Sequence, residues 1–358
     1  SNAHFGQAVA FPDLTRDGFP DLAVGAPDHD VLTTSGAGIV LLGRGSPFGL
    51  DVGLLGASGV SLVNRRVDAR TFGGNLTAGG RFGATLASGD FNGDGHRDLA
   101  IGAPGQSQVF VMLSPSSPYL TLTGSGGFGS ALAVADFDGD GRDDLAVGAP
   151  TALRTVGIRG VMAGQVIVFR GTANGLTLLQ TIAQSNLPDP NAVGGPEAGD
   201  AFGAALAAGN INGDVFADLV IGVPGEGYAG LAAAGVVYFV PGAPGAPLAV
   251  GSAVQREAST LPAPFTGPTA DARFGEVLAL GDFNGDLFDI HDVVVGVPRQ
   301  PVGTANEAGM IVVIPGALGL NPSTATVFTA TTLSGTTQAG ARFGHSVATG
   351  DFDADTLA

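Results

Sequence analysis

Short acidic turns recur along this sequence and carry the residues best suited to chemistry. The two clearest copies are DFNGDGHRD at 90–98 and DFDGDGRDD at 136–144. Oxygen-bearing side chains at positions 1, 3, 5 and 9 of such a turn face inward, and the glycine at position 6 permits the sharp bend. An all-oxygen cage suits Ca²⁺ better than Zn²⁺ or Cu²⁺, which favour histidine or cysteine. We therefore predict several Ca²⁺ sites.

The expected ligands are the side chains at these four positions, with the backbone carbonyl at position 7 as a further oxygen. In the second and third copies they are Asp90, Asn92, Asp94, His96 and Asp98, then Asp136, Asp138, Asp140, Arg142 and Asp144, where His96 and Arg142 contribute carbonyls. The first copy offers Asp13, Thr15, Asp17 and Asp21. The fourth offers Asn210, Asn212, Asp214 and Asp218, with Val215 in place of the glycine.

The last two copies are less regular. The fifth has Asp282, Asn284 and Asp286, and an insertion leaves either Asp289 or Asp292 as the closing ligand. The sixth has Asp351, Asp353 and Asp355 before the sequence ends. We expect the second and third turns to bind best and the fourth, with fewer charges, to bind weakly or stay empty. The plain alternative is a solvated hairpin turn. If Ca²⁺ binds, we expect a structural role, in which the ion holds together carboxylates that otherwise repel one another.

Each acidic turn lies at a fixed place in a longer repeat. A Phe-Gly pair precedes each turn, and its phenylalanine stands eight residues before the first oxygen ligand: Phe5, Phe82, Phe128, Phe202, Phe274 and Phe343. A Gly-x-Pro motif follows at Gly25, Gly102, Gly148, Gly222 and Gly296. Between these landmarks, short apolar runs predict four strands per repeat, the second of them buried on both faces. Such units are typical of propeller blades.

The sequence therefore predicts an all-β fold, a β-propeller of four-stranded antiparallel blades. Residues 1–3 resemble a tag-cleavage scar, and residues 4–358 are expected to form one domain. We place five complete blades at about 5–81, 82–127, 128–201, 202–273 and 274–342, with a partial sixth at 343–358, and expect a native ring of six or seven blades. A β-sandwich does not need an identical loop in every repeat, a β-helix has shorter repeats, and helices do not fit this density of glycine and β-branched residues.

The amino-acid composition makes some classes of binding partner unfavourable. The chain of 358 residues has a net charge of −17, and no patch of its 15 basic residues, all of them arginine, offsets the acid. Nucleic acid is therefore an unfavourable partner. No run of about 18 apolar residues predicts a membrane span. The chain has no cysteine, so it forms neither a disulfide framework nor a thiolate metal site.

The full pattern, FG followed by DxD/NxDGxxDLxxGAP, resembles the FG-GAP repeat of integrin α-subunit propellers and related bacterial surface proteins. This resemblance covers essentially the whole chain. It implies that each repeat is a blade and that the acidic loops bind Ca²⁺ on the face away from the main ligand-binding face. Integrin propellers have seven blades, whereas five complete repeats and a truncated sixth are present here. Nothing in the sequence indicates a partner β-subunit or a separate metal-dependent ligand site.

Three functional interpretations follow. We favour a secreted or cell-surface module that binds an unknown protein or surface ligand in adhesion or scaffolding. Its expected recognition surface is formed by long connections opposite the metal loops, at 56–80, 151–163, 184–200, 225–234 and 256–273. A second interpretation is a polysaccharide lyase or hydrolase, although the five histidines form no constellation and no catalytic motif is present, so we lean against an enzyme. A third is a lectin, which the absence of tryptophan and the placing of Tyr119 and Tyr238 in predicted strands weaken.

Overall fold

The computed structural model of the chain describes residues 3–50, 65–113, 119–156, 159–188, 195–243, 248–262, 265, 267–285, 290–316, 322–333 and 335–350. Within these ranges the regular elements are β-strands and six short 3₁₀ turns. The turns are η1 (Ala69–Phe72), η2 (Pro104–Gln106), η3 (Gln184–Asn186), η4 (Val250–Ser252), η5 (Ala258–Thr260) and η6 (Pro322–Thr324). The described part of the chain contains no helix long and apolar enough to cross a membrane.

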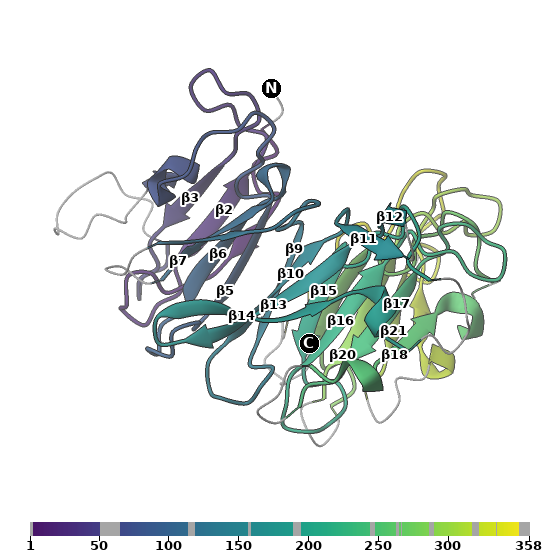
Figure 1. The fold of residues 1–358 in the computed structure, drawn as a ribbon. Coiled ribbons are helices and arrows are strands. Elements are labelled where there is room, and N and C mark those ends of the chain that lie inside the picture. Colours follow the sequence, from purple (N-terminus) through teal and green to yellow (C-terminus); the bar gives the residue numbers. More distant parts are fainter. Residues whose placement is uncertain are drawn as a thin grey trace. The chain divides into compact units, whose positions relative to one another are not determined.

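Each complete repeat forms one four-stranded sheet (Figure 1). The first has the order β1 (Val9–Ala10), β2 (Leu22–Ala26), β3 (Ile39–Gly43) and β4 (Arg65–Val67). The second has the order β5 (Thr85–Gly89), β6 (Asp98–Ala103), β7 (Gln108–Met112) and β8 (Leu120–Thr123). In both sheets every neighbouring pair is antiparallel, as meandering chain connections require.

The remaining sheets keep this plan. The third has the order β14 (Gly175–Ile182), β13 (Gln165–Thr172), β10 (Asp144–Ala149) and β9 (Ala131–Ala135). The fourth has β15 (Ala205–Gly209), β16 (Asp218–Val223), β17 (Val236–Val240) and β18 (Val254–Glu257), and the fifth has β19 (Val277–Gly281), β20 (Asp292–Val297), β21 (Met310–Ile314) and β22 (Thr326–Phe328). The prediction of an all-β fold built from four-stranded antiparallel blades is confirmed.

One element was not predicted. The connection at 151–163, expected to be a long loop, contains a separate two-stranded sheet of β11 (Leu153–Val156) and β12 (Arg159–Met162). Leu153 pairs with Met162 across this hairpin. Its short strands carry mixed polar and apolar residues without a strong period, so the sequence pattern alone gave little signal for it.

The chain divides into two compact units. The first comprises residues 1–135, 141–152 and 167–179, and the second comprises residues 136–140, 153–166 and 180–358. In the first unit, β1 and β5 lie against each other, as do β5 and β9, so consecutive blades stack through their first strands. In the second unit, β15 lies against β19 in the same way.

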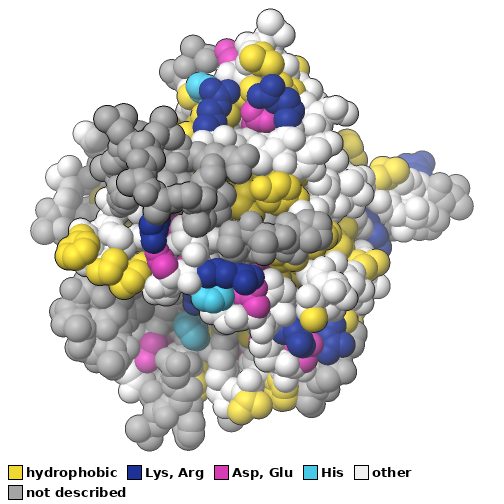
Figure 2. All heavy atoms as spheres, turned by 90° about the vertical axis from the view of Figure 1, so that its left-hand side faces the viewer, with side chains coloured by type: hydrophobic (Ala, Val, Ile, Leu, Met, Phe, Trp, Pro, Cys, Tyr) yellow, Lys and Arg dark blue, Asp and Glu magenta, His cyan; other side chains and the backbone are white. Residues whose placement is uncertain are grey.

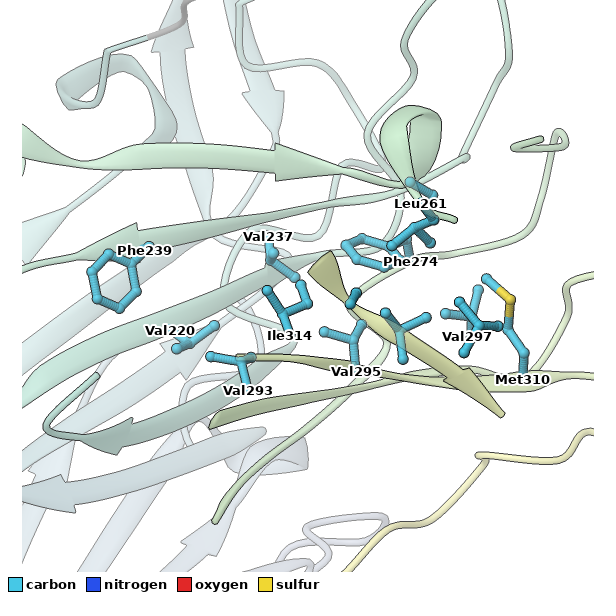
Figure 3. Packing of buried hydrophobic residues seen from close by; sticks show 14 of the residues in the cluster. Val220, Val237, Phe239, Leu261, Phe274, Val293, Val295, Val297, Met310 and Ile314 are labelled. Carbon is cyan, nitrogen blue, oxygen red and sulfur yellow. The ribbon is translucent and has the colours of Figure 1, made fainter. Parts of the chain in front are cut away.

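Apolar side chains fill the space between stacked blades. In the second unit a cluster joins β16 and β17 to β20 and β21, and Figure 3 shows Val220 and Val237 facing Val293 and Ile314 across that space. The first unit holds two such clusters, which contain Phe82 and Phe128 respectively. The second strand of each blade is buried on both of its faces, as β6 illustrates with all six residues buried. This burial explains its nearly continuous apolar sequence.

The two glycine motifs of the repeat meet where blades stack. A Cβ atom built on Gly25, which opens a Gly-Ala-Pro motif, would lie 2.0 Å from the carbonyl oxygen of Gly83, which belongs to the next Phe-Gly pair. The same contact joins Gly222 to Gly275 at 2.1 Å. Gly83 and Gly275 have φ values of 85° and 87°, which side chains rarely adopt. Glycine is therefore required at both places, because any larger residue would separate the blades.

Most phenylalanines of the Phe-Gly pairs are buried. Phe82, Phe128, Phe202 and Phe274 are fully buried. Phe5 differs, because 65% of its surface is exposed. Phe91 and Phe137, which follow the first aspartate of an acidic turn, are also fully buried. Phe82, Phe91, Phe128 and Phe274 all lie in the clusters between blades, where they pack one blade against the next.

Candidate metal centres

The first five acidic turns occupy the same place in their blades. Each joins the first strand to the second, as the turn 90–98 does between β5 and β6. The Gly-x-Pro motif lies at the far end of the second strand, so each blade has an acidic-loop end and an opposite end. We call the latter the GAP end. It carries η1, η2 and the hairpin bridges Val31–Thr34, Tyr228–Leu231 and Val302–Ala305.

The closing aspartate of each loop has a structural role that the sequence analysis did not find. Asp21, Asp98, Asp144, Asp218 and Asp292 are all nearly or fully buried. In four of them, one carboxylate oxygen accepts the backbone N–H of a glycine at the end of the third strand or just after it: Gly45 at 2.9 Å, Gly171 at 2.8 Å, Gly242 at 2.9 Å and Gly316 at 2.7 Å. A sequence signal existed, since three of these glycines stand 24 residues after their aspartate.

Burial also changes the acidity of these groups. It raises the pKa of the Asp218 carboxyl to about 6, against hydrogen bonds from backbone N–H groups that lower it. It raises the pKa of Asp21 as well. A positive ion close to these carboxylates would favour their charged form, so cation binding and ionisation are coupled.

In the first loop, two expected ligands contact basic side chains. Asp17 Oδ2 accepts hydrogen bonds from Arg44 Nε at 3.1 Å and Arg44 Nη2 at 2.7 Å. His96 Nδ1 lies 2.9 Å from Asp13 Oδ2. Partial burial tends to raise the pKa of Asp17, but hydrogen bonds from Arg44 and from the N–H of Phe19 outweigh it and lower that pKa. Arg44 therefore supplies positive charge to a loop that was expected to obtain it from a metal.

The first and second loops are also linked to each other. The N–H of Asp13 donates to the carbonyl oxygen of Arg97 at 2.9 Å. Arg16 forms an ion pair with Asp94. Within the second loop, the Asp90 carboxylate accepts the N–H groups of Asp94 at 3.0 Å and Gly95 at 2.8 Å, so it folds over the turn. Both carboxylate oxygens of Asp90 therefore face the backbone of their own turn.

The third loop brings three of its predicted ligands together. Oxygen atoms of Asp136, Asp138 and Asp144 lie within 4.8 Å of one another, and they are the one group of three potential metal-ligating residues that the described part of the chain brings this close. Asp138 is 4% exposed and Asp144 is fully buried. Asp136 Oδ1 also accepts the N–H of Asp140 at 3.1 Å. Like charges this close favour a neighbouring positive charge, which a bound cation would supply.

The fourth loop replaces this convergence with amide hydrogen bonds. Asn212 Nδ2 donates to Asp214 Oδ2 at 2.8 Å and to Asp218 Oδ1 at 3.3 Å. Asn210 Nδ2 donates to the carbonyl oxygen of Asp214 at 2.6 Å. The NH₂ group of Asn212 thus lies between the carboxylates where a metal would otherwise join them. The loop satisfies its own acceptors, in agreement with its expected weak binding.

The fifth loop is partly described. Asp292 occupies the closing position, where it accepts the N–H of Phe283 at 3.0 Å and Asn284 Nδ2 at 3.0 Å. The N–H groups of Asn284 and Gly285 bond to Asp282. Asp286 and Asp289 lie outside the described residues, as do Asp351, Asp353 and Asp355 of the sixth repeat. The metal assignment of every loop stays a prediction.

In the predicted recognition segments at the GAP end, some charged side chains make contacts within the fold. Asp68 is 6% exposed and caps η1, and its carboxylate pairs with Arg70 Nη2 at 2.7 Å. Arg154 donates to Gln165 at 2.9 Å. On the face drawn in Figure 2, basic side chains lie beside acidic ones, which fits such pairing. Parts of the predicted recognition segments, at 56–64, 157–158, 189–194, 263–264 and 266, lie outside the described residues.

Comparisons with known proteins agree with the repeat. A family model described as FG-GAP repeat matches residues 5–42, 128–169 and 202–240, and one described as FG-GAP-like repeat matches residues 90–147. Integrin alpha-PS5 of Drosophila melanogaster is 35% identical over 113 residues, covering 31% of this chain and 10% of the relative. Phosphatidylinositol-glycan-specific phospholipase D of Homo sapiens is 41% identical over 103 residues, covering 28% and 11%.

Integrin alpha-3 of Mus musculus is 34% identical over 117 residues, covering 32% of this chain and 10% of the relative. The chain thus spans about a tenth of the length of these curated relatives. Among solved structures, a thermostable family-43 glycoside hydrolase is similar with a TM-score of 0.38 and 11% identity, covering 94% of this chain and 95% of the hydrolase.

Proposed function

We propose, from the premise that this chain is built from FG-GAP repeats, that it is a Ca²⁺-stabilised propeller module that binds a protein or surface ligand outside the cell. Similarity to integrin α-subunits supports a role in adhesion or scaffolding. The observation that carries the Ca²⁺ part is the convergence of Asp136, Asp138 and Asp144 within 4.8 Å. The ion's role is structural, because its ligands lie in a loop at one end of a blade and not in a substrate cavity.

The ligand-binding part of the proposal rests on the two ends of the blades. Acidic loops of nearly constant length occupy one end, and their polar atoms are largely satisfied by the loops' own backbone. The GAP end carries connections of variable length and three exposed hairpin tips. Binding residues are commonly found on variable loops held by a rigid scaffold. We therefore assign recognition to the GAP end.

Calorimetric titration tests the Ca²⁺ part. Metal-free protein is expected to bind Ca²⁺ and to gain thermal stability with rising Ca²⁺ concentration, because binding to the folded state alone raises the unfolding free energy. Asp136→Asn should reduce this gain. Asp271→Asn is the matched control, because it removes the same charge at an exposed position of positive φ that asparagine tolerates. Melting curves that coincide in excess Ca²⁺ and in EDTA would contradict the proposal.

Site-specific labelling tests which end of the blades binds the ligand. The chain has no cysteine, so a single introduced cysteine can be labelled alone. Single substitutions Ala232→Cys at the GAP end and Val215→Cys at the acidic-loop end each create a unique site for a bulky maleimide polymer. Both positions are exposed in the second unit. Capture of ligand from a native cell-envelope fraction should fall after modification at residue 232 and persist after modification at residue 215. The reverse pattern would place recognition at the acidic-loop end.

A further inference from the structure

A polar hollow of about 490 Å³ lies at the GAP end of the second blade. Its walls come from the segment that follows η1, from η2, and from β7 and β8. The lining includes Phe72, Asn75, Thr77, Gln106, Gln108 and Thr121. The hollow and the acidic loop of this blade lie at opposite ends of β6. Asp98, the closing residue of the loop, begins the strand, and η2, which lines the hollow, follows its last residue.

The chemistry of the lining is unusual for this chain. Three carboxamide side chains and two hydroxyls line the hollow, and none of its described lining residues carries a formal charge. The protein as a whole has a net charge of −17. Carboxamides and hydroxyls both donate and accept hydrogen bonds. A surface of this composition matches a neutral ligand with many hydroxyl groups, whereas a cation would be expected to meet carboxylates and an anion to meet arginines.

A stack of aromatic rings contributes one lining residue of the hollow, Phe72, and continues from there to Tyr119. The ring centroid of Tyr119 lies 4.7 Å from that of Phe72, a lining residue, with an interplanar angle of 51°. Phe72 in turn packs against Phe82 at 5.8 Å and Phe110 at 5.4 Å, and both of those rings are fully buried. Tyr119 is 39% exposed. It is therefore the outermost ring of a stack anchored in the core between blades, and its position is fixed before any ligand arrives.

The polar wall is also held in place. Thr77 Oγ1 donates to Gln106 Oε1 at 2.9 Å, which leaves the NH₂ group of Gln106 as a donor on the amide's other side. The N–H of Gly80 donates to the carbonyl oxygen of Thr77 at 2.9 Å, and the N–H of Gly105 donates to that of Gly80 at 3.1 Å. These bonds tie the segment after η1 to η2. A site formed in advance loses less conformational entropy on binding.

We propose that this hollow binds a neutral oligosaccharide, with its hydroxyls on Asn75, Gln106, Gln108 and Thr121 and one face of a sugar ring against Tyr119. The exposure of Tyr119 changes the expectation from sequence, in which its place in a predicted strand argued against a sugar site. An aromatic ring with a polar tip suits a surface that is apolar on one side and wet on the other. The inference stands on the first unit alone and does not depend on Ca²⁺ binding.

Nuclear magnetic resonance or calorimetric titration of the full chain provides the test. The probes are neutral glucose-, mannose- and galactose-based oligosaccharides, with a uronic-acid oligosaccharide as the charged counterpart. At least one neutral series is expected to bind with a Kd of about 1 mM or tighter, as a shallow polar site allows. The uronic-acid series should bind at least about tenfold more weakly, because the acidic protein repels it.

Variants then place the binding in the hollow. Gln106→Ala and Tyr119→Ala should each weaken binding about tenfold, whereas Tyr119→Phe, which keeps the ring, should change it about twofold or less. Thr121→Ala should weaken binding, and Thr155→Ala is its control, since Thr155 is an exposed strand threonine of β11 in the second unit and does not line the hollow. Circular dichroism melts would verify that each variant is folded. No binding by any neutral series, equal binding of the uronic-acid series, or unchanged affinity in both Gln106→Ala and Tyr119→Ala would overturn the proposal.

Discussion

The third and fourth acidic loops share one backbone design and differ in how their acceptors are satisfied. Both close with a buried aspartate that accepts the N–H of a glycine at the end of the third strand or just after it, Gly171 in one loop and Gly242 in the other. In the third loop, Asp136, Asp138 and Asp144 converge within 4.8 Å. In the fourth loop, the Asn212 amide bridges two carboxylates by hydrogen bonds.

This difference shows that the loop residues have two separate roles, one in fastening the loop to the sheet and one in presenting negative charge. The closing aspartate fastens the loop to the sheet, and that role is the same with aspartate or asparagine at position 3. The side chains at positions 1 and 3 are aspartates in the third loop, where they converge, and asparagines in the fourth loop, where they donate hydrogen bonds. We therefore expect the third loop to depend on a bound cation more strongly than the fourth, although both close in the same way.

The largest effect is expected from removing the closing aspartate. Asp144→Ala and Asp218→Ala should each lower the free energy of unfolding by about 2–3 kcal/mol in metal-free buffer, because buried N–H groups lose their acceptor. Urea unfolding followed by intrinsic fluorescence or circular dichroism measures the effect. A large loss of stability in one variant and none in the other would show that the closing aspartate does not have the same role in the two loops.

The next effect concerns the response to Ca²⁺. At a Ca²⁺ concentration of about 100 times Kd, one bound ion adds about 2.7 kcal/mol to the unfolding free energy. Asp138→Asn in the third loop should remove one such increment. Asp214→Asn in the fourth loop should leave the Ca²⁺ response unchanged, because that loop already satisfies its acceptors. Thermal melts with and without EDTA would distinguish the two, and equal loss in both variants would contradict the distinction.

A variant expected to gain a Ca²⁺ site tests the role of position 3 in the fourth loop. Asn212→Asp removes two hydrogen bonds and adds a negative charge between Asp214 and Asp218, so we expect a loss of about 1 kcal/mol without metal. Excess Ca²⁺ should restore this loss and add one ion to the stoichiometry measured by calorimetry. Asn212→Ser, which adds no charge, serves as the control. If Asn212→Asp stays destabilised in Ca²⁺ with unchanged stoichiometry, position 3 does not decide metal binding.

The first loop offers an intermediate case with the smallest expected effect. Arg44→Gln should lower stability by about 0.5–1 kcal/mol at neutral pH, because the half-exposed pair with Asp17 is screened by water. The pKa of Asp17 is lowered in the folded state, so this stabilisation is present above the ordinary aspartate pKa and is lost as pH falls.

Denaturation of both proteins from neutral pH to about pH 2 in metal-free buffer measures this contribution, and the two stabilities should converge at the acid end. Arg159→Gln, at an exposed position of β12, controls for the loss of one positive charge. A difference between wild type and Arg44→Gln that persists at low pH would show that Arg44 acts through packing and not through the Asp17 carboxylate.

Much of the fold could be predicted because its signals are local and repeated. The apolar runs of β6 and β16, the Phe-Gly pairs and the acidic turns recur in one order, so each copy supports the interpretation of the others. The hairpin of β11 and β12 could not be predicted in this way, since it occurs in a single blade. The cap that Asp68 forms on η1 was not predicted either, because adjacent opposite charges in a loop can serve a cap as readily as a binding surface.

The blade type, the position of the acidic loops and the oxygen atoms that each loop can offer could all be predicted from the sequence. These follow from residue types at fixed short spacings, where chain connectivity alone limits the geometry. Tertiary structure alone decided that Arg44 approaches Asp17, that closing aspartates are held by glycines some two dozen residues away, and that Tyr119 is the exposed end of an aromatic stack. Such contacts join residues that are distant along the chain, and they depend on how strands and blades pack.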